Sequence, residues 1–401
     1  MERTELLNKA LHLLQSIPQN EAINYSKAWI NQDTALVVTN PEEYYQCIEE
    51  IFLSDKIVSS RFSRKSVFKH IEDVILNHRK KGTEITQNTA QSIFEDFNKV
   101  PSYSANVIAP ISGIRLDNAA VGYLEVSVFK LGRLEDLEFP MANSEGYYIK
   151  TAIDGSYDQF IAIEKAKDAF EDFSRLITFI SGKNDNSILI KTGLPLYPSL
   201  SHELMYVDTS SFQLVDDSGR FNQGTVSNRH LEKVPIDNHF FCKNTPFIKL
   251  WDIYEKQHNN KNLSDIHKRI INASLAVGES AKSENIKNSI IYTCIALEIL
   301  FSFDEGSIFQ KSIADRLADT FTFVVAKDKD SRLFTAKLLK KVYQMRSALV
   351  HGGKKQLTND YVAINILLRA AISELLNNEK YAHIKKIDGL YEMVKEAHYS
   401  Y

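Results

Sequence analysis

The sequence predicts an α+β protein in which a mixed α/β part is followed by a wholly helical bundle. Between residues 103 and 217 several runs alternate apolar and polar residues, as half-buried strands do. After Pro246 the apolar residues recur at steps of three and four, which is the spacing of helices. The length of 401 residues exceeds what one ordinary core needs. We therefore expect a mixed domain at residues 1–240, undivided or split into 1–100 and 101–240, and a helical domain at residues 245–401.

Composition and charge are those of a soluble globular protein. Hydrophobic residues make up 44% of the chain and charged residues 25%, and the formal net charge is −3. No overall field attracts a polyanion, so a nucleic-acid site has to be a local patch. The N-terminal segment MERTELLNKALHLLQ lacks the pattern of a secretion signal, and no apolar run reaches membrane-spanning length. We expect a cytoplasmic protein without membrane contact.

The three cysteines indicate reduced, structural thiols. Cys47, Cys242 and Cys294 are odd in number, far apart and not at metal-ligand spacing. The sequence also lacks the motifs G-x-x-x-x-G-K-[ST], G-x-G-x-x-G and H-E-x-x-H. His202 and Glu203 have no second His at helical spacing, and the remaining histidines form no ligand set, among them His12, His230, His239, His267 and His383. We expect neither a metal nor a nucleotide cofactor.

The first 100 residues mix short helices with one strand. We expect a helix at Glu5–Gln15, a strand at Thr34–Thr39 and a helix beginning at Pro41, which the first helical turn tolerates. A further helix, Arg61–Lys81, is basic at both ends. It is either an ordinary solvated helix whose last residues answer the helix dipole or a second polyanion surface. The residues of that surface are Arg61, Arg64, Lys65 and Arg79.

The middle region combines strands with one helix. The strands are expected at Val121–Lys130, Gly146–Ile153, Ile188–Thr192 and Leu204–Thr209. A helical stripe of apolar residues extends over Gln159–Ile180. The stretch Asp216–His239 carries little periodicity, which predicts a loop or an interdomain linker. The tyrosine pairs Tyr44-Tyr45 and Tyr147-Tyr148 are interpreted as half-buried core rather than as base-stacking platforms.

The C-terminal part is predicted to be helical throughout. The expected helices are Phe247–Gln257, Leu263–Lys282, Glu284–Phe303, Ile308–Val325, Ser331–Val350, Asp360–Asn378 and Tyr381–His398. Ser307 with Gln310 forms a capping box, and Thr358 precedes Asp360 in a first turn. Short connections between these helices favour antiparallel neighbours in a bundle.

The segment Ser331–Gln356 carries the strongest functional signal. Its helix has a predicted buried stripe of Leu333, Phe334, Leu338, Leu339, Val342, Met345, Leu349 and Val350. Arg346 and His351 are five residues apart, so an unbroken helix would point them about 140° apart. Gly352 and Gly353 predict a left-handed helix stop, which places His351 at the helix end, where its imidazole can turn back beside the guanidinium.

The same segment is basic. It contains seven Lys or Arg residues and no Asp or Glu. We expect four of these cations to contact RNA: Lys340, Lys341, Lys354 and Lys355. An Arg can hold a phosphate by a fork of donors, and a His can move protons near neutral pH, so Arg346 and His351 suit metal-independent cleavage of RNA. Because one His cannot easily be both acid and base, a two-fold dimer that pools two copies of each residue is attractive.

Spacing alone does not identify this site, since Arg64 and His70 are also an Arg followed by a nearby His. The wider context resembles HEPN domains, and in particular the Apea-like HEPN proteins of bacterial defence loci. The resemblance covers about residues 245–395. It rests on RIINASLAVGESAKSENIKNSIIYTCIALEILFS at Arg269–Ser302, SIFQKSIADRLADT at Ser307–Thr320 and LLKKVYQMRSALVHGG at Leu338–Gly353.

The resemblance implies a homodimeric, metal-independent endoribonuclease of a bacterial antiviral defence or toxin-antitoxin system. Arg346 and His351 would carry the reaction, with Ser347 where the family favours Asn, Asp or His. Glu298, in the ALE run, is assigned to holding helices together rather than to catalysis. RNA, with tRNA as a candidate, and an antitoxin or regulatory protein are the implied partners, and residues 1–240 would sense, select or regulate. The alternatives are a non-catalytic HEPN module that dimerises and binds RNA or a partner, and a DNA-binding regulator, which lacks a helix-turn-helix signature.

Overall fold

The computed structural model confirms the α+β class. It describes the chain except residues 1, 25–27, 31–33, 117–122, 139–145, 186, 194–205, 216–220, 304–311 and 400–401, and except the side chains of residues 22–34, 123, 206–231, 238 and 398. The chain forms two compact units: Met1–Val107 with Ala152–Ala166, and Ile108–Thr151 with Lys167–Tyr401. The predicted division near residue 240 into a mixed domain and a helical domain stays a prediction.

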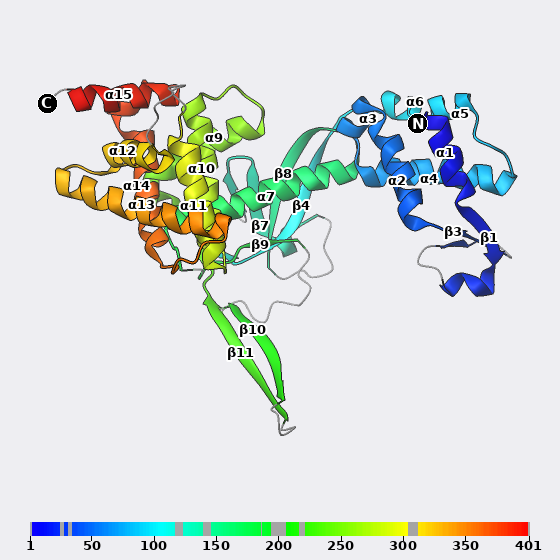
Figure 1. Cartoon of the computed structure of the whole chain (residues 1–401), viewed down its shortest axis with the longest axis horizontal. Helices are drawn as coiled ribbons and strands as arrows, with labels where there is room; N and C mark the ends of the chain where they lie inside the picture. Colours follow the sequence, from blue (N-terminus) through cyan, green and yellow to red (C-terminus); the bar gives the residue numbers. More distant parts are fainter. Residues whose placement is uncertain are drawn as a thin grey trace. The chain divides into compact units, whose positions relative to one another are not determined.

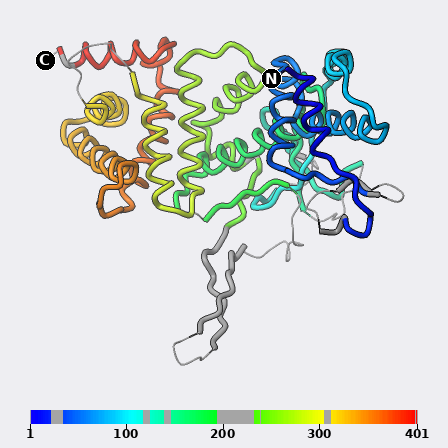
Figure 2. Tube along the Cα trace, turned by 45° about the vertical axis from the view of Figure 1, so that its right-hand side comes forward, coloured from blue at the N-terminus to red at the C-terminus, as the bar shows by residue number. Residues whose placement is uncertain are grey.

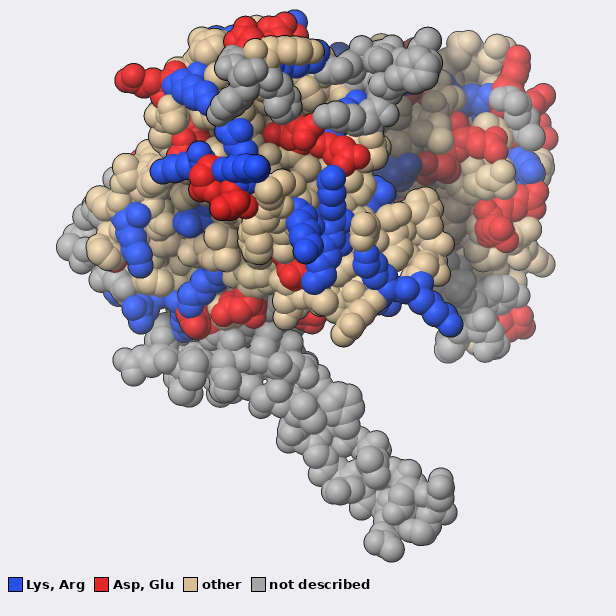
Figure 3. Space-filling view, turned by 60° about the vertical axis from the view of Figure 1, so that its left-hand side comes forward, with Lys and Arg blue, Asp and Glu red and all other residues tan. Residues whose placement is uncertain are grey.

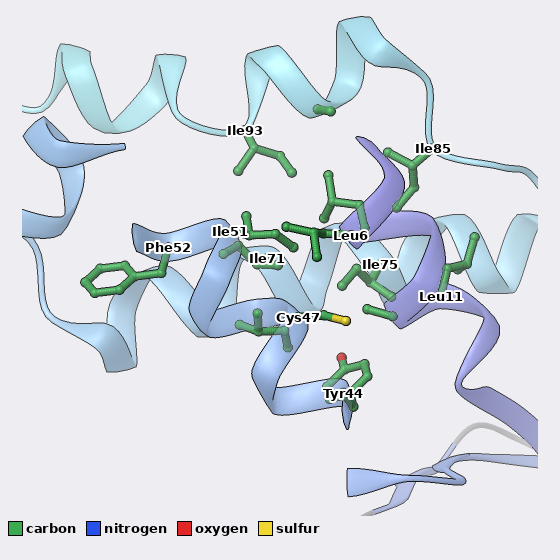
Figure 4. Close-up of a cluster of buried hydrophobic side chains, with 14 of the residues drawn as sticks. Leu6, Leu11, Tyr44, Cys47, Ile51, Phe52, Ile71, Ile75, Ile85 and Ile93 are labelled. Carbon is green, nitrogen blue, oxygen red and sulfur yellow. The ribbon is translucent and has the colours of Figure 1, made fainter. Parts of the chain in front are cut away.

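The first unit is a helical layer with a small sheet. Its helices are α1 (Arg3–His12), α2 (Pro41–Leu53), α3 (Lys56–Arg61), α4 (Arg64–Lys81), α5 (Gln87–Ser92) and α6 (Glu95–Lys99). Three antiparallel strands lie in the order β1 (Leu14–Pro18), β3 (Thr34–Val38), β2 (Ala28–Ile30). Figure 4 shows Leu6, Cys47 and Ile71 gathered between α1, α2 and α4, where all three side chains are buried.

Two predicted helices of this unit have different ends. The expected helix Glu5–Gln15 stops at His12, because Leu14 and the residues after it pair with β3 as strand β1. The expected helix Arg61–Lys81 is interrupted after Arg61. Phe62 is extended there, and the Ser63 side chain accepts a hydrogen bond from the Ser66 backbone N–H and so begins α4 anew. The helix at Pro41 is confirmed, with Asn40 as its N-cap.

The second unit contains a five-stranded sheet in the order β6-β7-β8-β4-β9. Its strands are β4 (Tyr103–Ser112), β6 (Tyr123–Val126), β7 (Phe129–Arg133), β8 (Tyr147–Ser156) and β9 (Lys191–Thr192), and the helix α7 (Gln159–Ser181) follows β8. The start of β4, the end of β8 and the start of α7 belong to the first unit. The expected single strand Val121–Lys130 is instead a hairpin, because the chain turns at Ser127, which has a φ of +54°.

The stretch expected to be a linker, Asp216–His239, is largely ordered into strands, so that prediction was wrong. β10 (Tyr206–Val215) and β11 (Phe221–Leu231) form a long antiparallel hairpin (Figure 1). β12 (Val234–Pro235) then pairs in parallel with β5 (Ile114–Arg115), and α8 (Asn238–Lys243) follows. Cross-strand backbone hydrogen bonds need no alternation of side chains, which is why the sequence pattern missed them.

The C-terminal helices are confirmed. They are α9 (Ile248–His258), α10 (Asp265–Lys282), α11 (Ile286–Phe301), α12 (Ile313–Val325), α13 (Lys329–His351), α14 (Asp360–Asn377) and α15 (Ile387–Tyr399). Figures 1 and 2 show them side by side, in yellow-green to red. The expected cap pair Ser307 and Gln310 lies outside the described residues, and Ser312 caps α12. Within the described part of the chain, no helix is long and apolar enough to cross a membrane.

A buried polar network locks three helices of this bundle together. The Asn365 side chain of α14 accepts a hydrogen bond from the Thr293 hydroxyl of α11 at 2.9 Å and donates to the Ser280 hydroxyl of α10 at 3.0 Å. All three residues are at most 1% exposed. Because each buried polar atom in this set needs its partner, the network selects one relative position of α10, α11 and α14.

The cysteines and tyrosines occupy the expected environments only in part. All three cysteines are free, with Cys47 and Cys294 buried and Cys242 exposed, so only the first two have a packing role. Tyr44 and Tyr148 are buried, as expected for core positions.

Candidate active site

The helix α13 has well-defined ends. At its start the Asp328 side chain accepts a hydrogen bond from the Ser331 backbone N–H at 2.9 Å, and the Asp328 backbone N–H donates to the Ser331 hydroxyl at 3.3 Å, so the two form a capping box. At its end Gly352 takes a φ of +73°, and the N–H groups of Gly352 and Gly353 both donate to the Ala348 carbonyl. This confirms the predicted glycine stop, because a residue with a side chain is strained at that φ.

Arg346 lies on the inward side of α13 and faces α11. Its Nη2 atom is 3.8 Å from Glu298 Oε1, and its Cζ atom is 5.7 Å from the centre of the Tyr343 ring. The Tyr343 hydroxyl donates to the same Glu298 oxygen at 2.5 Å. Glu298 therefore joins α11 to α13 and holds the guanidinium, which matches the structural role expected of it.

This polar cluster contains no reactive nucleophile. Burial and the hydrogen bond to Glu298 raise the pKa of Tyr343, so its hydroxyl remains a donor. Burial, aided by the charge of Glu298, raises the pKa of the neighbouring Cys294 to about 12, so this thiol remains protonated at neutral pH. What the cluster can do is fix the direction in which the Arg346 guanidinium points.

His351 is exposed, as the last residue of α13. Among the described residues no hydrogen bond joins it to Arg346. His351 itself is helical, and Gly352 is the residue that leaves the helix. With the helix unbroken from Arg346 to His351, the two side chains leave it about 140° apart. Ser347 is half-buried beside Arg346 in sequence.

The predicted buried stripe of α13 is wrong in part. Leu333 and Phe334 are 61% and 67% exposed, and Val350 is 53% exposed. The inward positions are Thr335, Leu339, Val342 and Met345. Thr335 lies one turn before Leu339 and is buried there, whereas the apolar pattern predicted that Leu333 and Phe334 would be the buried residues of this turn. Burial is set by contact with other helices and not by side-chain type alone.

The predicted RNA-contacting lysines divide into two groups. Lys340 Nζ lies 2.5 Å from Asp315 of α12, and Lys341 Nζ lies 2.6 Å from Asp360 of α14. The segment that has no acid in sequence therefore meets carboxylates in space. Figure 3 shows the same mixture at larger scale, with Lys and Arg interleaved with Asp and Glu on the face that it presents.

The other two lysines follow the helix end. Lys354 and Lys355 are exposed, and the Lys355 ammonium contacts the side-chain oxygen of Gln344. Together with Lys287 of α11 they line a shallow hollow of about 480 Å³, whose lining also includes Ala348 and Gly353. We call this the lysine hollow.

Three of the four cations of the second predicted basic surface contact neighbouring side chains within the first unit. Glu49 binds Arg64 through two guanidinium nitrogens, at 3.0 and 2.8 Å. Arg79 lies in the last turn of α4, ahead of the glycine cap. The two remaining cations lie over aromatic rings, Arg61 over Tyr157 at 5.1 Å and Lys65 over Phe160 at 4.3 Å. These contacts fit the alternative of an ordinary helix surface.

Arg64 and His70, the other Arg followed by a nearby His, are not brought together. His70 is half-buried with its ring edge-on to Phe97 at 5.1 Å, while Arg64 is bound to Glu49 at the helix start. The described residues hold no group of three or more His, Cys, Asp or Glu side chains that could bind a metal ion. His202, Glu203 and the side chain of His230 lie outside the described part.

Two residues of the site were missed at the level of sequence. Tyr343 precedes Arg346 by three positions, so helical spacing could have placed the two on one side. Lys287 had no local signal, because only the fold brings α11 beside the end of α13. Comparison of the chain with known protein families, with curated proteins and with solved structures found no match.

Proposed function

We propose that this protein is a metal-independent endoribonuclease whose active site forms between two copies of the chain. The observation that carries the proposal is the placement of Arg346 and His351 on α13. The guanidinium is held inward by Glu298, whereas the imidazole is exposed at the helix end. A single chain thus presents the two groups apart, and a second α13 packed across the first would supply the missing partner. The resemblance of residues 245–395 to HEPN domains supports the same arrangement.

The reaction follows from the chemistry of the two side chains. One His351 takes the proton of a ribose 2′-OH, whose oxygen forms a bond to phosphorus. The bond from phosphorus to the 5′ oxygen breaks, and the second His351 gives that oxygen a proton. Arg346 binds the phosphate and stabilises the charge that develops on it. The products are a cyclic 2′,3′-phosphate and a 5′-hydroxyl.

Three neighbours of the reacting groups have supporting roles. Glu298 and Tyr343 limit the motion of Arg346, so the guanidinium loses less freedom when it binds phosphate. Ser347 can donate or accept one hydrogen bond to help orient the phosphate. We further propose that the enzyme acts in the cytoplasm within a bacterial defence or toxin-antitoxin system, on RNA such as tRNA and under the control of an antitoxin or regulatory protein.

The direct test is cleavage of tRNA by the purified full chain in EDTA, with sequencing of 5′-hydroxyl ends. Arg346→Ala and His351→Ala should each abolish cleavage. The matched controls Arg332→Ala, on the exposed start of the same helix, and His383→Ala, at another exposed position, should cut as the wild type does. Cleavage that persists in both site variants would remove the assignment.

A mixing experiment tests the shared site. An excess of the His351→Ala protein, mixed with the wild type and allowed to exchange subunits, should lower the cleavage activity below that of the wild type alone, because each mixed dimer keeps only one of the two His351 residues that the reaction uses. A light-scattering mass of a monomer at micromolar concentration would contradict the composite site.

A second candidate function is a non-catalytic module that dimerises and binds RNA or a partner protein. The pairing of Lys340 and Lys341 with carboxylates and the presence of Ser347 beside Arg346 favour it. Growth arrest on overexpression of the wild type, but not of His351→Ala, would decide for the enzyme. RNA binding without toxicity or cleavage would decide for the module.

A further inference from the structure

The lysine hollow differs from the rest of the basic segment in having no acidic residue among those that line it. Lys287 comes from the second position of α11, and Lys354 and Lys355 come from the chain just after α13. Two elements far apart in sequence therefore bring three ammonium groups to one concave place. Lys340 and Lys341, by contrast, are already neutralised by Asp315 and Asp360.

The charges of the hollow are not compensated by the protein. Among the described residues, Lys287 and Lys354 form no ion pair, and Lys355 contacts only the neutral amide of Gln344. The start of α11 adds the positive end of a helix dipole. The end of α13 adds a negative one, but the Ala348 carbonyl there already accepts hydrogen bonds from Gly352 and Gly353. The net field favours an anion.

We propose that the lysine hollow binds a phosphate of the RNA chain next to the phosphate that is cleaved. This inference rests on the proposed function and deepens it. The hollow is lined by residues on both sides of His351 in sequence, Leu349 and Gly353, so a strand whose scissile phosphate reaches the imidazole passes near it. Its shallow form suits a backbone that lies across the surface, and lysine ammonium groups bind phosphate oxygens as mobile point charges.

The test measures RNA binding apart from cleavage. The His351→Ala full chain is titrated with a fluorescently labelled single-stranded oligo-uridine RNA over a series of salt concentrations. In that background Lys287→Ala with Lys354→Ala removes two cations of the hollow. The control removes two exposed lysines, Lys261→Ala with Lys268→Ala, from near the start of α10, about 20 Å of helix away from the end of α10 that leads into the start of α11.

Each phosphate contact contributes about 0.7 to the slope of log affinity against log salt concentration for a single strand. Because the hollow is proposed to hold one phosphate, its variant should lose about 0.7 from the slope, and a fourfold rise in salt should weaken its RNA affinity by a factor of about 2.6 less than it weakens that of the parent. The control should keep the slope and affinity of its parent.

The outcomes separate this inference from the proposed function. A hollow variant that binds like the control overturns the subsite, even if the wild type cleaves RNA, and so does a parent that binds no RNA. A lower slope in the hollow variant establishes the subsite, even if the wild type proves unable to cleave RNA.

Discussion

Gly278→Ala should destabilise the second unit, because α7 crosses α10 at this glycine. A Cβ atom at residue 278 would lie 2.1 Å from the Arg175 carbonyl oxygen and 2.7 Å from its carbonyl carbon. Both are backbone atoms of a helix, so no side-chain rotation can relieve the overlap. The helices would have to separate, and the 2.8 Å ion pair of Arg175 with Glu279 lies at the same crossing.

The size of the effect follows from two opposing contributions. Overpacking of a close contact costs about 1–3 kcal/mol, occasionally more. Replacing Gly by Ala inside a helix returns about 1 kcal/mol of helix propensity. Since the overlap is with backbone, we expect the upper part of the first range and a net loss of about 2 kcal/mol in the free energy of unfolding.

A matched control is provided by Gly389→Ala in α15. The nearest atom to a Cβ there is Ile384 Cγ2 at 3.7 Å, an ordinary van der Waals contact. Only the propensity gain remains, so this variant should be more stable than the wild type by up to about 1 kcal/mol.

The assay is urea unfolding of the full chain followed by tryptophan fluorescence. The chain has two tryptophans, so Trp29→Phe as a common background leaves Trp251, which is buried 6.0 Å from Phe173 of α7, as the reporter. A Gly278→Ala midpoint equal to or above that of the background would refute the reasoning about this crossing.

Three further predictions concern single interactions. Tyr343→Phe should lower the free energy of unfolding by about 1.5 kcal/mol, at the low end for a hydrogen bond to a charged group because Glu298 is 31% exposed; a calorimetric melt with no change would contradict this. Asn365→Ala should cost about 2–4 kcal/mol, since it leaves the buried Ser280 hydroxyl without its donor and opens a cavity, and equal denaturation midpoints would disprove it. Burial, with the charges of Lys385 and Lys256, holds the pKa of His267 below its ordinary 6.5, so the folded state binds fewer protons than the unfolded one and the free energy of unfolding should fall as the pH drops below about 6.5. In thermal melts at a series of pH values, the stability of His267→Gln should fall less than that of the wild type. Parallel plots of stability against pH for the two proteins would refute the assignment.

Much of the bundle was predictable because its signals are local. Apolar spacing and capping residues lie within one helix, so α10, α13 and α14 follow from the sequence to within a few residues. The same holds for Gly352, whose left-handed conformation is a property of the residue and its neighbours. The hairpin of β10 and β11 was missed, since its pairing is made by backbone groups between two segments.

The site was predictable as a set of residues but not as a geometry. Arg346 and His351 could be picked out on α13, yet their separation depended on which residue ended the helix. The absence of acids from Ser331–Gln356 suggested four free lysines, and two of these meet Asp315 and Asp360, which come from other helices.

The sequence by itself determined the class of the fold, the order of the bundle helices and the glycine that ends α13. These depend on interactions among residues a few positions apart, and such interactions are written in the local pattern. Only the tertiary structure decided that Glu298 and Tyr343 hold Arg346, that Lys340 and Lys341 are neutralised, and that Lys287 and Lys354 line one hollow. Those contacts join residues distant in the chain, and packing of the helices alone brings them within reach of the short-range forces that act between side chains.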